Sequence, residues 1–408
     1  MSWIVDVPQN DTFDLFLTAA VPENIGNVRM VVQSGGASFE FPLHPTKGPE
    51  KISGPDNVQR MKVGTGIPLG AGCREISLRS ADAEAKTVVA YFRSLDLVPA
   101  SAVRVLEEEG KRIAAARASY EWMVKAGYGL MFHWTSQSVN PDGSCRPYAD
   151  AVRDFDVKKF AGMVEETGAG YIIFTIGHAE PFCPAPLKSW EKYLPGKTTD
   201  RDLIREIAEA LAAKDIKLLG YVPSHIVAKY NKVDDLEFMK IHMEILQEMG
   251  ERYRDRIAGY WFDTWYRCFE EHPNASFEAF FNAAKAGNPD RIIALNSYIY
   301  PPVTLWQEYW AGEVTYPVAP PVKGFMTDGP APELRYHALL IMEPYWVQTK
   351  PDVSDPKWKA EELSKYIRDC QAEGGAVTIN LGIYQDGMVG QKDLEVMKKI
   401  CKTLRNGG

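Results

Sequence analysis

The sequence predicts an α/β protein, a (β/α)₈ barrel of the TIM type preceded by a small all-β sandwich. Two observations lead to this prediction. From residue 127 onward, short apolar runs alternate with amphipathic stretches, which is typical of parallel strands joined by helices. Before residue 99, apolar and polar residues alternate in short runs bounded by Gly, Pro, Asn and Asp, which is typical of a β-sandwich. A chain of 408 residues is long enough for both domains.

Residues 1–98 are expected to form the sandwich. The alternation is clearest in five runs, at 13–17, 28–32, 38–41, 75–78 and 88–92. The segment 66–78, which reads GIPLGAGCREISL, resembles a strand of galactose-binding-like jelly rolls. This resemblance implies a domain that binds a sugar, braces the barrel or mediates dimer contacts, and the sequence leaves these three roles open.

Residues 99–126 are expected to link the domains, and residues 127–408 to form the barrel. After a hinge at Val98-Pro99-Ala100, the stretch 102–126 is rich in Glu, Lys, Arg and Ala and predicts a helix. Barrel strands are predicted at 129–132, 171–175, 217–222, 259–262, 291–295, 340–342 and 376–379, with a weaker run near 310–316. Helices are predicted at 154–167, 200–213, 235–251, 275–286, 356–373 and 390–405. Eight strands in about 280 residues fit a closed barrel. A doubly wound sheet normally has a Gly-rich loop after its first strand, and this chain has none there.

Composition and charge exclude several functional classes. There are 46 basic and 54 acidic residues, so the net charge of −8 argues against a nucleic-acid binder. No run of about 18 apolar residues predicts a membrane-spanning helix, and the N-terminus carries no visible signal peptide. Six Cys without C-x-x-C spacing are expected to be mostly reduced thiols of a cytoplasmic protein. A secreted protein trimmed of its signal would have the same composition.

Polar side chains follow most of the predicted barrel strands. Because active sites of such barrels lie at the carboxyl ends of the strands, these residues are the candidates for a shared site. In strand order they are His133 and Trp134, His178 and Glu180, Tyr221 and His225, Trp261, Asp263 and Trp265, Asn296, Glu308 and Glu313, Glu343 and Trp346, and Asn380. Each alone has a structural interpretation, such as a helix cap or a turn. Together they predict one pocket, since so many buried polar groups are costly unless they meet.

Two chemistries could use this set. Glycoside hydrolysis needs an ionised carboxylate and a protonated carboxylic acid, for which Asp263 and either Glu313 or Glu308 are candidates. Metal-dependent hydrolysis would instead use His133, His178, His225 and Asp263 as ligands. The carboxylate pair is favoured, because the first strand carries one His rather than the H-x-H of metal-dependent barrels.

Five segments in order resemble glycoside hydrolase family 29, the α-L-fucosidases, over about residues 120–405. They are GYGLMFHW at 127–134, TIGHAEPF at 175–182, WFD at 261–263, EYWAGE at 308–313, and GGAVTIN at 374–380 with Asp386-Gly387. A Trp346-centred segment precedes the last of these. The resemblance implies a retaining enzyme with Asp263 as nucleophile, Glu313 as acid/base, and His133 and His178 as contacts to sugar hydroxyls.

The remaining strand-end side chains are expected to bind substrate: Trp134, Glu180, Tyr221, His225, Trp261, Trp265, Asn296, Glu343 and Trp346. No metal or organic cofactor is expected, and the expected partner is a carbohydrate rather than a nucleic acid or a membrane, with homo-oligomerisation left open. Gly177 and Ala179 stand where the family has Lys and His, so a retaining glycosidase for another sugar is one alternative. The others are a carbohydrate-binding pseudoenzyme, a metallohydrolase, and Glu308 or Glu343 as the acid.

Overall fold

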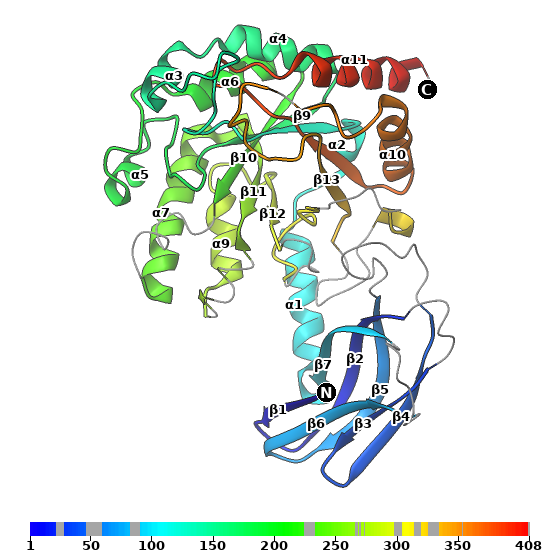
Figure 1. Cartoon of the computed structure of the whole chain (residues 1–408). Coiled ribbons are helices and arrows are strands. Elements are labelled where there is room, and N and C mark those ends of the chain that lie inside the picture. The colour runs from blue at the N-terminus through cyan, green and yellow to red at the C-terminus, as the bar shows by residue number, and fades with distance from the viewer. Residues whose placement is uncertain are drawn as a thin grey trace. The chain divides into compact units, whose positions relative to one another are not determined.

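The structure is a computed structural model that divides into two compact units, the first comprising Met1–Ala116 and the second beginning at Arg117 (Figure 1). The described residues are all those of the chain except 22–27, 46–58, 82–89, 224–232, 266, 267, 269, 270, 273, 298–303, 314–319, 325–333, 353, 407 and 408.

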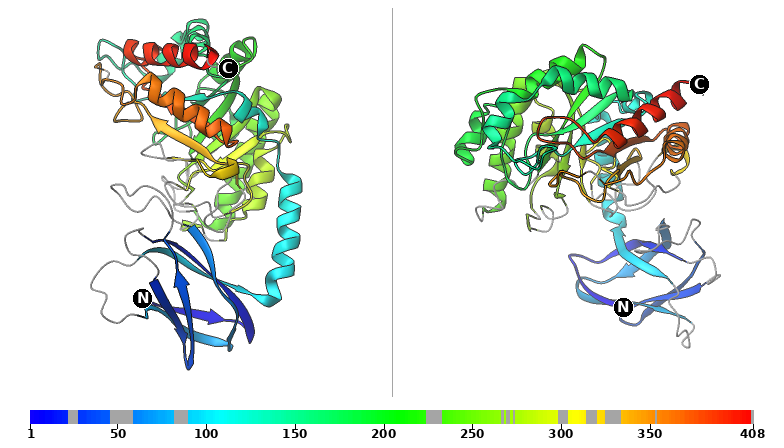
Figure 2. Two further views of the ribbon diagram at one scale, coloured as in Figure 1. Left: turned by 90° about the vertical axis from the view of Figure 1, so that its right-hand side faces the viewer. Right: turned by 45° about the horizontal axis from the view of Figure 1, so that its top comes forward.

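The first unit contains two antiparallel sheets, as the alternating pattern predicts (Figure 2). One sheet has the order β1-β6-β3-β4 and the other β5-β2-β7. The strands are β1 (Ser2–Val7), β2 (Asp11–Ala20), β3 (Val28–Ser34), β4 (Ala37–Leu43), β5 (Gln59–Leu69), β6 (Gly72–Ser80) and β7 (Tyr91–Pro99). Alternate residues of β2, such as Phe13, Leu15 and Leu17, are buried because successive side chains of a strand point to opposite faces.

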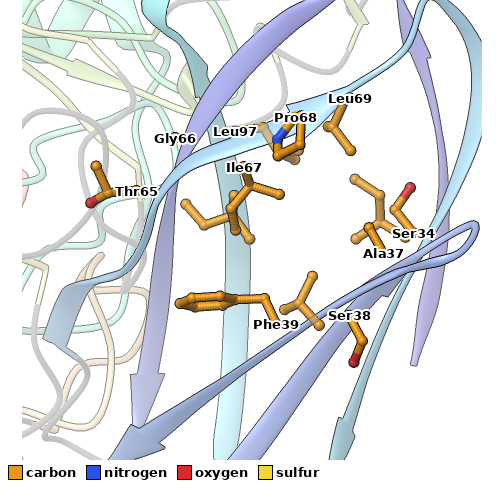
Figure 3. A pocket seen from close by; sticks show the side chains of 13 residues that line it. Ser34, Ala37, Ser38, Phe39, Thr65, Gly66, Ile67, Pro68, Leu69 and Leu97 are labelled. Atoms are coloured by element: carbon orange, nitrogen blue, oxygen red, sulfur yellow. The ribbon is translucent and has the colours of Figure 1, made fainter.

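A cavity of about 210 Å³ lies in the core of this sandwich (Figure 3). Phe39, Ile67 and Leu97 are among the apolar side chains that line it, and its polar side chains are limited to Ser34, Ser38 and Thr65. A bound sugar needs hydrogen-bond partners for most of its hydroxyl groups. The cavity therefore has few side chains that could form hydrogen bonds to a sugar ring.

The segment after the sandwich contains two helices, α1 (Val103–Ala116) and α2 (Glu121–Lys125), where the sequence predicts one over 102–126. The interruption follows from side-chain bonds outside the helix. The guanidinium of Arg117 donates to the carbonyl oxygen of Leu305, and the backbone N–H of Ala118 donates to Glu308. Beyond the interruption, Tyr120 and Met123 pack among the strand residues of the second unit's core.

The second unit is built around a parallel sheet of seven strands in the order β12-β11-β10-β9-β8-β14-β13. They are β8 (Gly129–Phe132), β9 (Tyr171–Thr175), β10 (Lys217–Pro223), β11 (Ile257–Asp263), β12 (Ile292–Leu295), β13 (His337–Ile341) and β14 (Ala376–Asn380). Each overlaps a predicted strand. The first and last strands of the sequence, β8 and β14, are neighbours, which is the pairing that closes a barrel.

Helices cover the outside of this sheet (Figure 1). They are α3 (Tyr148–Asp154), α4 (Val157–Thr167), α5 (Lys188–Tyr193), α6 (Leu203–Ala212), α7 (Asp235–Tyr253), α9 (Phe277–Ala284), α10 (Ala360–Ala372) and α11 (Gln391–Asn406). Side chains of Asp156, Asp202, Asp234 and Ser276 cap the first turns of α4, α6, α7 and α9. None of the helices in the described part of the chain is long and apolar enough to cross a membrane, and none of the six Cys residues, all of which are described, forms a disulfide.

Of the predicted strand near 310–316, residues 314–316 lie outside the described part of the chain, and residues 310–313 do not form a regular strand. Its place in the wall is taken by an irregular segment, 307–313, which has only isolated parallel bridges to the β13 side, Tyr309 with Arg335 and Glu313 with Leu339. On the β12 side, side chains replace part of the backbone ladder. The oxygens of Glu308 and Gln307 accept the N–H groups of Ile293 and Leu295, at 2.8 and 2.9 Å.

Gly312 allows this segment to approach β13. Its φ is +68°, and a Cβ at this position would lie 1.9 Å from the carbonyl oxygen of His337. The backbone N–H of Leu339 donates to the Gly312 carbonyl across this contact, at 2.7 Å. Residue 312 must therefore be a glycine for the segment to keep its place.

We expect Gly312→Ala to lower the free energy of unfolding by at least ~2 kcal/mol, because it adds left-handed strain and a clash with a backbone oxygen. Urea unfolding measures this loss. The matched control is Gly162→Ala in α4, where a Cβ meets nothing within 4 Å. That change should be neutral or stabilise by up to ~1 kcal/mol, and equal effects of the two changes would contradict the assignment.

Candidate active site

Asp263 is the last residue of β11 and is only partly buried. Its Oδ1 accepts the backbone N–H of Thr264 at 2.7 Å and the side-chain amide of Asn296 at 2.9 Å. Its Oδ2 accepts the hydroxyl of Tyr221, from the end of β10, at 2.5 Å. Thr264 has a φ of +60°, so the chain turns sharply directly after the carboxylate. Three donors thus orient the Asp263 side chain at the carboxyl end of the sheet.

Asn296 joins Asp263 to a second carboxyl group. The residue follows β12, is fully buried, and its backbone N–H donates to the carbonyl of Phe262 in β11 at 2.7 Å. Its side-chain amide nitrogen donates to Asp263 Oδ1 at 2.9 Å and to Glu313 Oε2 at 2.8 Å. The two carboxyl oxygens therefore share one donor. The distance between these two oxygens cannot exceed the combined length of the two hydrogen bonds. This length is shorter than the ~6.5–9.5 Å that separates the two carboxyl groups of inverting glycosidases.

Burial raises the pKa of Glu313 from its usual 4.5 to about 7, and the nearby charge of Asp263 raises it further, against the hydrogen bond from Asn296. A carboxyl group with a pKa near 7 exists in both protonation states at neutral pH. It can therefore give a proton as a general acid and take one as a general base.

His133, directly after β8, lies in an aromatic group formed by three of the predicted residues. Its ring centre is 5.5 Å from that of His178, 4.9 Å from Tyr221 and 5.2 Å from Trp346. Burial, together with the neighbouring His178, lowers the pKa of His133 to about 3, so this imidazole is neutral. Its Nδ1 is 2.7 Å from Asn380 Oδ1, which makes Nδ1 the donor and leaves Nε2 as an acceptor.

Asn380 is a site residue that the sequence-derived set of substrate contacts lacks. It ends β14, which neighbours β8, and its amide nitrogen also donates to the backbone carbonyl of Trp346 at 3.3 Å. Asn380 thus connects the His133 ring to the segment that carries Trp346. The signal that could have identified it is the pairing of the first and last strands of a closed barrel.

Three predicted tryptophans face the protein interior rather than the His133 group. Trp134 packs against Phe155 and Phe174 and donates to the backbone of Gln385. The Trp265 ring packs against Phe277 and Phe280 of α9. Trp261 is buried in the barrel core, where its ring stacks on Tyr221 at 5.5 Å. Trp261 therefore supports a site residue from behind, whereas Trp134 and Trp265 belong to the wall.

Glu308 and Glu343, the two other candidate acids, are engaged away from Asp263. Glu308 is buried and paired with Lys285 at 2.6 Å, and it accepts the backbone N–H groups of Ala118 and Ile293. Glu343 is fully buried and accepts the N–H of Gly382 at 2.9 Å. Neither is joined to Asp263 by the Asn296 bridge that holds Glu313.

Glu180 is exposed and accepts a hydrogen bond from Ser136 at 2.7 Å, so it lies near the loop after β8. His225 lies outside the described residues. Within the described part of the chain, no group of three or more His, Cys, Asp and Glu side chains is placed to hold a metal ion. A histidine-based metal site would also use His225, so this statement covers only the other candidate ligands.

Comparisons with known proteins show what this chain is similar to. The sequence model of the alpha-L-fucosidase family matches residues 147–408. The chain is similar to the solved alpha-L-fucosidase AlfC from Lactobacillus casei in complex with α-L-fucose, with 18% identity, 70% of this chain and 98% of that chain covered, and a TM-score of 0.50. It is also similar to a bacterial fucosidase with a monovalent iminocyclitol inhibitor, with 16% identity, 71% and 75% covered, and a TM-score of 0.50. At these identities the structural likeness shows a shared fold. A search of curated proteins finds no match.

We expect Glu313→Gln to remove a pH dependence of stability. The pKa of Glu313 is raised in the folded protein, so its contribution to stability is fully present below about pH 4.5 and is lost as the pH rises through about 7. The variant should therefore gain stability relative to the unchanged protein over this range, by up to ~3 kcal/mol. Urea unfolding at pH 5, 6, 7 and 8 measures the difference.

The control for this measurement is Glu395→Gln, which removes an exposed carboxylate from α11. It should follow the pH dependence of the unchanged protein. A Glu313→Gln variant that does the same would show that Glu313 carries no raised pKa.

Proposed function

We propose, since the chain belongs to the alpha-L-fucosidase family of glycoside hydrolases, that Asp263 and Glu313 are the residues with which it hydrolyses its glycoside substrate. The observation that carries this assignment is the pair of hydrogen bonds from Asn296 to both carboxyl groups. The substrate is a carbohydrate, and an α-L-fucoside is the substrate that the family suggests. Hydrolysis proceeds by double displacement, with net retention of the anomeric configuration.

The close approach of the carboxyl groups supports retention. An inverting enzyme needs room for a water molecule between its base and the sugar, and its carboxyl groups lie ~6.5–9.5 Å apart. The shared Asn296 donor holds one oxygen of Asp263 and one oxygen of Glu313 closer together than this range. Asp263 therefore attacks the anomeric carbon itself and forms a glycosyl-enzyme, while Glu313 protonates the departing oxygen.

The same geometry lets Glu313 exchange roles between the two steps. In the free site, the charge of Asp263 helps to raise the pKa of Glu313, which keeps a proton available for the leaving group. Once Asp263 has become an ester, that charge is gone and the pKa of Glu313 falls. Glu313 then takes a proton from the incoming water as a general base, and hydrolysis of the ester restores the starting state.

The His133 group supplies the contacts that orient the sugar. The neutral His133 ring offers Nε2 as an acceptor for a hydroxyl group, and its orientation is fixed by Asn380. The half-buried face of Trp346 lies against the same ring, where it can cover an apolar face of the sugar. Tyr221 binds Asp263 and also packs against His133, so it connects the nucleophile to the sugar contacts.

One observation keeps a related sugar as the alternative substrate. Gly177 has no room for a side chain, since a Cβ there would lie 2.6 Å from the buried ring of Trp190. The wall after β9 therefore presents no side chain from this position to a ligand. A substrate that needs fewer polar contacts on that side than fucose would suit this wall.

We expect Asp263→Gly to lower turnover of an aryl α-L-fucoside on the order of 10⁴-fold or more, because the covalent intermediate can no longer form. Azide should restore activity and yield a glycosyl azide of inverted configuration, while the first product of the unchanged enzyme keeps the α configuration. Proton NMR identifies both anomers. Near-normal turnover by a folded Asp263→Asn variant would remove Asp263 from this role.

The acid role of Glu313 is tested by the leaving group. Glu313→Ala should slow substrates with poor leaving groups by on the order of 10²–10⁴-fold, while activated aryl glycosides need little protonation and lose much less in the glycosylation step. The matched controls are Glu308→Ala and Glu343→Ala. For each variant, kcat/KM is measured with both substrate types, and the ratio of the two values is compared between variants. If either control showed the leaving-group dependence and Glu313→Ala did not, that residue would be the acid.

A further inference from the structure

A second group of buried acidic side chains lies apart from the Asp263 pair. Glu343 follows β13, and Asp393 lies in the first turn of α11. Both side chains are fully buried, and burial together with the neighbouring Asp393 carboxyl group raises the pKa of Glu343. Within the described residues, Glu343 Oε2 and both carboxyl oxygens of Asp393 accept no hydrogen bond. Two ionised carboxyl groups offer each other only acceptor oxygens. A proton or a cation between them is needed to satisfy these oxygens.

Gln348 adds a neutral oxygen to this group. Its side chain is fully buried, and its amide nitrogen donates to the backbone carbonyl of Lys350. The amide oxygen is therefore turned the other way, and it has no hydrogen-bond partner among the described residues. It lies 2.5 Å from the point that a Cβ of Gly382 would occupy, and Glu343 Oε1 lies 3.3 Å from the same point. The Gln348 and Glu343 oxygens thus both border the space that a side chain at residue 382 would occupy.

A proton shared between the two carboxyl groups would give a hydrogen bond to only some of these buried oxygens. One proton can join Glu343 to Asp393, but the Gln348 oxygen and a second Asp393 oxygen remain buried without a donor. The nearby ammonium of Lys392 is bonded to Asp355. Four buried oxygens that need positive charge, two of them formally anionic, are the ligand set that a hard divalent cation prefers.

We propose that Glu343, Gln348 and Asp393 form a structural binding site for a hard divalent cation of the Ca²⁺ class. The charge of the ion balances the two carboxylates, and the amide oxygen of Gln348 completes the protein ligands. The ion takes no part in the chemistry at Asp263. It fastens the loop that follows β13 to the start of α11, and this loop also carries Trp346.

The purified full-length protein tests the proposal without any variant. Metal analysis after dialysis against CaCl₂ and then metal-free buffer should find about one Ca²⁺ per chain. Chelation with EDTA should lower the Tm by several degrees, and 1 mM CaCl₂ should restore it, because an ion that binds only the folded state stabilises it by mass action. No bound metal, together with a Tm that is unchanged by EDTA and CaCl₂, would overturn the proposal.

Variants show whether the ion lies at these residues. Asp393→Asn and Gln348→Leu should each lose the bound Ca²⁺ and the Tm response to it, while the exposed neighbour change Glu395→Gln should keep both. If Asp393→Asn does not fold, Gln348→Leu supplies the same readout. A Ca²⁺ response that survives in both ligand variants would place the ion elsewhere and overturn the assignment. A Tm that ignores Ca²⁺ but falls steadily as the pH rises would identify a shared proton instead.

Discussion

The side-chain amide of Asn296 is the constraint on which the site depends. Asp263 ends β11 and Glu313 lies in the segment 307–313, with β12 between them, so no backbone pairing brings the two carboxyl groups together. A buried amide that donates to both oxygens lets two acidic groups stand close without a cation. The position of Asn296 is in turn fixed by its backbone bond to Phe262 at the end of the same strand that carries Asp263. The strand, the amide and the second carboxyl group form one connected unit.

The seven-residue wall segment 307–313 both anchors itself to its neighbours and carries a proposed catalytic group. Glu308 is held by Lys285 and by backbone N–H groups from β12 and from Ala118, and Gly312 fits only as a residue without a side chain. Glu313, one residue further, is the group with the pKa near 7. Because the segment is fixed by side chains on one side and by isolated bridges on the other, it can place Glu313 without the regular spacing of a strand. The irregular element of the barrel is therefore the one that carries the proposed acid.

Much of this architecture could be predicted from the sequence, because strands buried on both faces and capped amphipathic helices leave strong periodic patterns. The differences between the predicted and the observed structure have local causes. The 307–313 wall is held by side-chain bonds and isolated backbone bonds, and no hydrophobic pattern predicts these. Successive residues after a strand point in different directions, so His133 lies in the aromatic group while Trp134 packs into the wall. Glu343 lies just after β13 and Asp263 ends β11, yet the side chain of Glu343 is near Asp393 of α11 and not near Asp263. The approach of Asn380 to His133 follows from the pairing of the last and first strands of the closed barrel, which the set of predicted substrate contacts did not use.

The fixed tautomer of His133 has a consequence for which ligands can enter. Since Nδ1–H is committed to Asn380, the ring presents only a lone pair at Nε2, and its neutral state persists through the ordinary pH range. A ligand oxygen that carries a hydrogen meets that lone pair favourably. An oxygen that carries a methyl or acyl group has no hydrogen to donate, so its lone pair would face the lone pair of Nε2. His133 is buried, so no water molecule would bridge the two acceptors. In the proposed role of His133 as a sugar contact, this imidazole would select a free hydroxyl group over a methylated or acylated one.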